Sequence, residues 1–289
     1  MVTDQCDPPF ENLQPIIHVM KDYRAPEIRN FAVTGHASLF CEAMLVCAGK
    51  ITRPGTIEQG NTVSDFHPDE KEHHQSIHAT VITEEWLGRE LNIIDCPGTP
   101  DFISEPLSAL RVADSTVIVI SGVNGVETGA DEIWAAAAEY DIPRFLVINM
   151  LDRERTRFDE ILEEARDHYG ARVFPMTLPV DAGPDFRSVL DVMRSEVITF
   201  AADGSGKYEE KPAEGALKER VTELHRQLID MVAESEDELL EKWARDSKIL
   251  DIFGIRGEER GGFADSRFHR EIRILPGGPC DGRREGAGR

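Results

Sequence analysis

The candidate binding residues of this sequence lie in short polar motifs at the ends of predicted strands. Asp95 ends one apolar run and is followed three positions later by Gly98. A carboxylate at a strand end can hold Mg²⁺ through water, and a glycine lets a backbone N–H approach a phosphate oxygen. Gly35 and His36 follow the predicted strand 28–34, where a first strand would meet a phosphate-binding loop.

A third motif follows the apolar run 145–149. Asn149 and Asp152 lie three residues apart, so an amide and a carboxylate can face one planar base. The carboxylate accepts two N–H donors from guanine, a pair that adenine does not supply. Each motif alone is common as an ordinary turn, and only their order and spacing indicate a guanine-nucleotide site.

The elements that must position these motifs are buried strands alternating with helices. The predicted strands are 28–34, 79–87, 91–95, 116–121 and 145–149, the second and third forming a hairpin. The predicted helices are 42–49, 131–140 and 157–169. Continuous apolar runs suit strands buried on both faces of a mainly parallel sheet. The sequence therefore predicts an α/β, doubly wound domain.

Residues 172–243 differ and predict an appended α/β subdomain. The expected elements are a strand at 173–180, a helix near 188–195, a strand at 197–200 and a long helix at 213–243. In the long helix, apolar residues recur at spacings of three and four, which places them on one face.

Composition restricts the partners. The 289 residues include 32 Lys and Arg against 54 Asp and Glu, so the net charge of −22 disfavours non-specific nucleic acid and anionic membranes. No apolar run approaches the roughly 20 residues that span a bilayer, and no secretory signal is visible. Five scattered cysteines without a C-x-x-C pair favour free thiols. We expect a cytoplasmic chain.

In this order and spacing, the motifs resemble the translational GTPases, and elongation factor G most of all. Residues 95–98 with Asp101-Phe102 resemble the family's Asp-Thr-Pro-Gly-His-x-Asp-Phe, and 149–153 resemble Asn-Lys-x-Asp-Arg. The resemblance implies a P-loop NTPase-like fold, GTP or GDP with Mg²⁺ as cofactors, and the ribosome as partner. The nucleotide-binding residues it implies are Gly35, His36, Asp95, Gly98, Asn149 and Asp152. Asp95 and Ser76 are its implied Mg²⁺ ligands.

The resemblance also fixes the expected domains. Residues 1–27 are a lead-in, 28–171 the GTP-binding core and 172–243 the inserted subdomain. Residues 244–289, rich in Gly and Arg, are either a disordered tail or the product of a shifted reading frame.

The phosphate loop departs from the family pattern, which begins Gly-His and ends in Gly-Lys-Thr. Without a gap those last three positions are Phe40, Cys41 and Glu42, and with the following helix aligned about four residues are missing. Thr99 stands where the family has its catalytic His. We therefore expect impaired nucleotide binding and no assigned catalytic residue. An active GTPase fragment, a catalytically dead binding module and a non-functional truncated product stay open.

Four histidines, at 67, 73, 74 and 78, raise the question of a metal site. His74 and His78 are four apart, which would suit one face of a helix. No carboxylate or cysteine is placed as an evident third ligand, so the sequence favours a solvated, switch-like loop.

Overall fold

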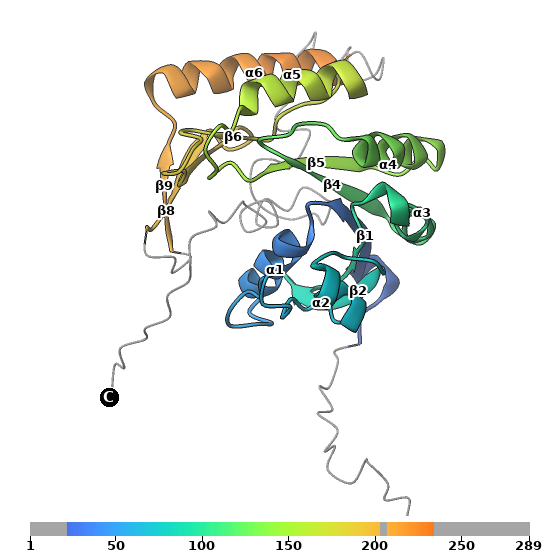
Figure 1. Cartoon of the computed structure of the whole chain (residues 1–289). Helices are drawn as coiled ribbons and strands as arrows, with labels where there is room; N and C mark the ends of the chain where they lie inside the picture. Colours follow the sequence, from blue (N-terminus) through green and yellow to red (C-terminus); the bar gives the residue numbers. More distant parts are fainter. Residues whose placement is uncertain (1–21, 203–206, 234–289) are drawn as a thin grey trace, which may run out of the picture.

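A computed structural model describes residues 22–202 and 207–233. Its main sheet has five strands in the order β2-β3-β1-β4-β5 (Figure 1). The strands are β1 (Ile28–Gly35), β2 (Thr80–Trp86), β3 (Arg89–Asp95), β4 (Ser115–Ser121) and β5 (Arg144–Asn149). All neighbours pair in parallel except β2 and β3. The predicted mainly parallel α/β sheet is confirmed.

The register brings the polar motifs to one edge of the sheet. Asp95 pairs with Val33, two residues before Gly35 ends β1. On the other side of β1, Gly35 pairs with Val119, and β4 continues to Ser121, which pairs with Asn149. The carboxyl ends of β1, β3, β4 and β5 therefore meet at the edge where open α/β sheets bind their ligands.

Helices cover both faces of this sheet. Alternate strand residues such as Val33 and Val119 pack with Phe40 and Leu45 of α1 (Ser38–Cys47). The intervening residues face α3 (Ser104–Leu110) and α4 (Thr128–Glu139) on the other side. This two-sided covering explains the nearly continuous apolar runs of β4 and β5.

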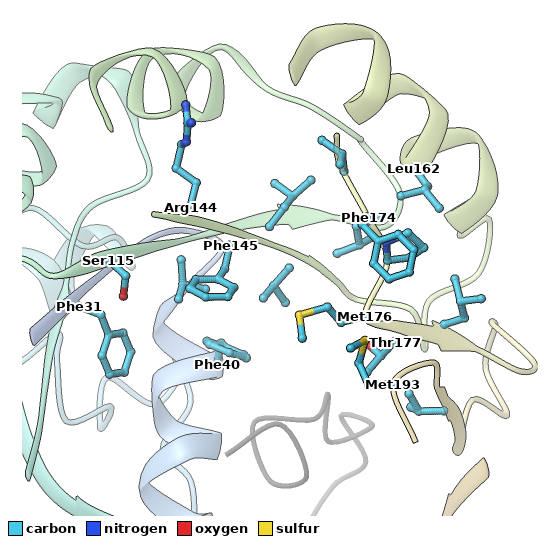
Figure 2. A pocket seen from close by; sticks show the side chains of 18 of the residues that line it. Phe31, Phe40, Ser115, Arg144, Phe145, Leu162, Phe174, Met176, Thr177 and Met193 are labelled. Atoms are coloured by element: carbon cyan, nitrogen blue, oxygen red, sulfur yellow. The ribbon is translucent and has the colours of Figure 1, made fainter. Parts of the chain in front are cut away.

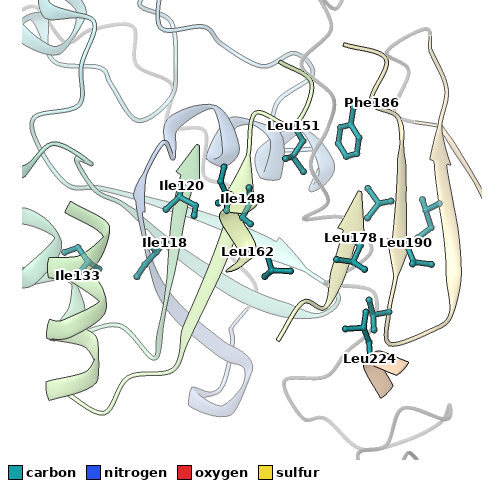
Figure 3. Close-up of a cluster of buried hydrophobic side chains, with 14 of the residues drawn as sticks. Ile118, Ile120, Ile133, Ile148, Leu151, Leu162, Leu178, Phe186, Leu190 and Leu224 are labelled. Carbon is teal, nitrogen blue, oxygen red and sulfur yellow. The ribbon is translucent and has the colours of Figure 1, made fainter. Parts of the chain in front are cut away.

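A second sheet of four antiparallel strands follows α5 (Phe158–Tyr169). Its strands are β6 (Thr177–Pro179), β7 (Ser188–Asp191), β8 (Glu196–Phe200) and β9 (Tyr208–Pro212), followed by α6 (Gly215–Ala233). Apolar side chains of both sheets form one buried cluster (Figure 3). An ion pair of 2.8 Å between Arg220 and Asp159 joins α6 to α5, which run side by side in Figure 1.

Two predicted elements need correction. The helix expected near 188–195 is wrong, because Val189 and Leu190 lie in β7 and pair with β8 and β6. A short apolar run does not distinguish a strand from a buried helix by periodicity alone. The loop expected around the histidines contains a short helix, α2 (Pro68–His73).

The hairpin between β2 and β3 is confirmed. Leu87 and Gly88 have φ values of 48° and 77°. A two-residue hairpin turn of type I′ requires positive φ at both of its central residues. Elsewhere in the described residues, 3₁₀ turns occupy Ala25–Glu27 and Pro100–Phe102. None of the helices in the described part combines the length and apolar character needed to cross a membrane.

Candidate functional site

The junction between β1 and α1 is unusually short for a phosphate loop. Only His36 and Ala37 separate Gly35 from the first residue of α1. Gly35 has a φ of +92°, and a β-carbon there would lie 2.1 Å from the carbonyl oxygen of Val119. The amide of His36 donates to that same oxygen at 3.0 Å. The chain thus turns directly from strand to helix without a wide loop that could enclose a phosphate.

Gly98 closes the same space from the neighbouring strand. A β-carbon on Gly98 would lie 2.5 Å from the carbonyl oxygen of Gly35 and 2.7 Å from its Cα. On its other side, the carbonyl oxygen of Gly98 lies 2.9 Å from the place of a β-carbon on Gly129. The two backbones that would face a nucleotide's phosphates are therefore in direct contact with each other.

The junction also lacks a cation. Residues 35–42 contain neither lysine nor arginine. Nε2 of His36 lies 3.2 Å from a carboxylate oxygen of Glu127, so the histidine is partnered by an acid rather than open to an anion. Phosphate binding usually needs charge-assisted donors such as lysine. In the described residues, no lysine or arginine in the segment from Gly35 to Glu42 supplies such a donor.

Asp95 is buried beside the junction, with 2% of its surface exposed. Neither carboxylate oxygen has a hydrogen-bond partner among the described residues. Burial raises the pKa of Asp95 to about 7; the nearby Ser64 hydroxyl opposes this rise, and repulsion from Asp65 adds to it. Two orphaned, buried oxygens are a place where a divalent cation would replace missing partners.

Asp65, whose charge acts on Asp95, is itself bonded to hydroxyl groups. The Ser76 hydroxyl donates to Asp65 at 2.6 Å and lies 3.1 Å from the Ser38 hydroxyl in the first turn of α1. Mg²⁺ prefers hydroxyl, carboxylate and water oxygens, so these residues fit the cation better than they fit the phosphates. Ser38 was missed by the sequence analysis. When α1 is aligned on Glu42, Ser38 takes the place of the family's loop Thr.

Glu42 does not face a phosphate position. It is buried, and its carboxylate accepts hydrogen bonds from the amides of Gly55 at 2.6 Å and Val63 at 2.5 Å. The side chain therefore fixes the segment between α1 and α2 against the helix. Charge-assisted bonds to backbone amides explain how a carboxylate is accommodated in this buried place.

Thr99, at the position of the family's catalytic His, has a partner of its own. Its hydroxyl accepts a hydrogen bond from the side-chain amide of Gln75, the neighbour of Ser76. This contact joins the segment before β2 to the turn after β3. The Thr99 hydroxyl keeps its own O–H donor, but it has no imidazole nitrogen with which to act as a base.

The motif that was predicted to bind the base lies at the end of β5. The side-chain oxygen of Asn149 accepts from the amide of Met150 at 2.8 Å, and its carbonyl accepts from Gly122 at 2.7 Å. Met150 has a φ of +60°, which turns the chain sharply towards the half-buried Asp152. Asn149 and Asp152 are therefore on one tight turn at the same sheet edge as Gly35.

A cavity of about 740 Å³ lies apart from these motifs (Figure 2). Phe40 of α1, Phe145 of β5 and Met176 beside β6 point into it. None of the residues that were predicted to bind nucleotide is among the described residues that line it. Its walls are mainly apolar, which does not suit a phosphate.

The comparison with known families decides the assignment. A family model described as the elongation factor Tu GTP binding domain matches residues 26–259. The chain belongs to this family. Two elongation factor G proteins are similar: that of Mycoplasma pneumoniae is 29% identical over 244 residues, and that of Thermotoga petrophila is 30% identical over 227 residues.

The similarity covers most of this chain but little of each relative. The alignments include 83% and 77% of the chain, against 35% and 33% of the two elongation factors. A crystal structure of a Thermus thermophilus protein superposes with a TM-score of 0.70 at 27% identity, over 86% of this chain and 36% of that one. The chain thus spans about a third of the length of these proteins. The predicted tail lies outside the described residues, although the GTP-binding family match continues past position 243.

Proposed function

We propose that the chain is an elongation-factor-G-like guanine-nucleotide-binding domain in which binding of the phosphates is impaired. The observation that carries this proposal is the two-residue junction after Gly35, with Gly98 packed on its carbonyl. Guanine recognition is assigned to Asn149 and Asp152. The proposal places the chain in the cytoplasm, with the ribosome as partner and 172–243 as the inserted subdomain.

The side chains at this site are better suited to binding Mg²⁺ than to binding phosphates. Ser38, Ser76 and Asp95 would hold Mg²⁺, which would supply charge neutralisation for a bound phosphate. The residues themselves hold the cation and exclude the phosphates from the junction. No side chain is assigned to orient water, since Thr99 stands where the family has its His and has no imidazole. Hydrolysis is therefore proposed to be weaker still than binding.

A second candidate is a non-catalytic binding module. Glu42 holds the segment containing Gly55 and Val63, and Gln75 is bonded to Thr99. Family members of this fold commonly use such segments to report the nucleotide to a partner. A chain that fixes them by internal contacts would present one surface regardless of GTP.

The test is titration of a fluorescent GDP analogue in excess Mg²⁺ with the natural chain and a variant with a restored loop. Replacing Ala37 with x-x-x-Gly-Lys recreates the family's spacing up to Ser38. One restored charge-assisted contact is worth about 1.5–3 kcal/mol, so affinity should rise roughly tenfold to hundredfold. A matched variant ending in Gly-Ala should gain less. Micromolar binding by the natural chain, with no gain in the variant, would refute the proposal.

A further inference from the structure

Three side chains outside the nucleotide motifs converge near α2. His67 precedes this helix, Asp69 is in its first turn, and His78 lies just before β2. One ligand atom from each, an imidazole nitrogen or a carboxylate oxygen, lies within 4.8 Å of the other two. The carboxylate that the sequence analysis did not find is Asp69, which is close to the histidines because the chain doubles back after α2.

The backbone positions of both histidines depend on one buried side chain. Glu70 is 1% exposed. One of its carboxylate oxygens accepts from the amide of His67 at 3.1 Å, and the other accepts from the amides of Ile77 and His78, both at 3.0 Å. A single carboxylate therefore sets the separation of the two histidines. Nothing in the proposed nucleotide function requires this arrangement.

We propose that His67, Asp69 and His78 bind a divalent transition-metal ion of the Zn²⁺ class. Two imidazoles and one carboxylate are a donor set for such ions, whereas Mg²⁺ prefers oxygen ligands alone. With bonds of about 2.0–2.1 Å, tetrahedral ligand atoms lie roughly 3.3 Å apart. Nε2 of His78 and Oδ2 of Asp69 are already 3.5 Å apart. A water molecule would take the fourth position.

Small rotations of the side chains would bring the His67 imidazole within bonding distance of a metal ion held by Asp69 and His78. The side chains of His78 and Asp69 are 45% and 49% exposed, so they can rotate without disturbing the core. The rings of His67 and His78 are 4.7 Å apart between centroids, and His67 also contacts the ring of Phe66 at 4.4 Å. The site is separate from the oxygen set at Ser38 and Ser76.

The test is calorimetric titration of the full chain with Zn²⁺ in excess Mg²⁺. His67→Gln, Asp69→Asn and His78→Gln should each weaken binding more than about tenfold. His73→Gln is the matched control, since it removes a histidine from α2 that is outside the cluster, and it should leave the affinity within about twofold of the natural chain. Unfolding curves without metal establish that each variant is folded.

Two further readouts separate a metal site from a simple His78–Asp69 ion pair. Bound Co²⁺ should give visible d–d absorption without thiolate charge transfer, because no cysteine is a ligand. Glu70→Gln should lower the affinity about tenfold through the positions of the histidines. Absence of Zn²⁺ binding by the natural chain would overturn the proposal. Equal affinities in all three ligand variants and the His73→Gln control would do the same.

Discussion

Gly98 is packed against Gly35. The carbonyl oxygen of Gly35 lies 2.5 Å from where a β-carbon of Gly98 would be, and the Cα of Gly35 lies 2.7 Å from it. Both glycines belong to the motifs that the resemblance assigns to phosphate binding. This contact lies beside the shortened junction after Gly35, and it is the structural basis of the proposal that phosphate binding is impaired.

Alanine substitutions at three glycines should lower the free energy of unfolding by different amounts, according to how closely each glycine is packed. Gly49→Ala meets open space and suffers only from its φ of +72°, which costs about 1 kcal/mol. Gly98→Ala should cost about 1–3 kcal/mol, because it inserts a methyl group into backbone. Gly35→Ala combines a 2.1 Å overlap with a φ of +92° and should be the most destabilising. Urea unfolding measures the three free energies, and an order with Gly98→Ala below Gly49→Ala would contradict the packing.

The buried carboxylates predict stability that falls as pH rises. Burial raises the pKa of Asp95 from 3.8 to about 7, and burial likewise raises that of Glu84 from 4.5 to about 7, opposed by Lys50. A folded-state pKa above the unfolded value favours the folded state at low pH. This advantage is lost as pH rises from about 4 through 7. The free energy of unfolding should therefore be lower at pH 8 than at pH 5.

Asp95→Asn should remove the part of the pH dependence of the unfolding free energy that is due to the Asp95 carboxyl. At pH 8 the variant should be more stable than the natural chain by on the order of 2–4 kcal/mol, whereas near pH 4 the two should be similar. Glu84→Gln should remove a separate share in the same pH range. Chemical unfolding at several pH values gives the comparison, and an Asp95→Asn chain that is less stable at pH 8 would exclude a buried, unpartnered charge.

Mg²⁺ should offset the loss of stability that the ionised Asp95 carboxylate causes at high pH. If the cation is held by Asp95 with Ser38 and Ser76, millimolar Mg²⁺ should raise the melting temperature at pH 8, since ligands that bind only the folded state stabilise it. The rise should vanish in Asp95→Asn and shrink in Ser38→Ala. Equal rises in all three chains would show that Mg²⁺ acts elsewhere.

Glu42 predicts a local effect on the segment that it holds. Glu42→Gln leaves one acceptor for the amides of Gly55 and Val63 and turns an N–H towards the other. The expected loss is about 1.5–3 kcal/mol, with faster hydrogen exchange at those two amides. Glu58→Gln, at an exposed position of the same segment, is the control and should change neither quantity.

Strand β4 could be predicted because it is largely buried and almost wholly apolar, as is typical of a central parallel strand. The β2–β3 hairpin was predictable from Gly88, whose positive φ the turn requires. Strand β7 was not, since four residues are too few to show a period of two. Strand β9 was missed as well, because all five of its residues are exposed and polar character alone does not indicate a strand.

At the site, residue types could be predicted but not their partners. The sequence indicates that Gly35, Asp95 and Gly98 belong to one motif set, and the parallel register brings them to one edge. It does not indicate that Glu42 points to Gly55 or that Asp69 meets His78, because these contacts depend on how a long loop folds back. Contacts made through loops have no periodic signal in the sequence.

The most direct test compares guanosine with GDP as ligands of the natural chain in excess Mg²⁺. If the phosphate space is closed and without a cation, the two phosphates add no favourable contact. The dissociation constant of GDP should then be equal to or larger than that of guanosine, more so given the net charge of −22. A calorimetric dissociation constant for GDP that is at least a hundredfold smaller than that for guanosine would contradict the account.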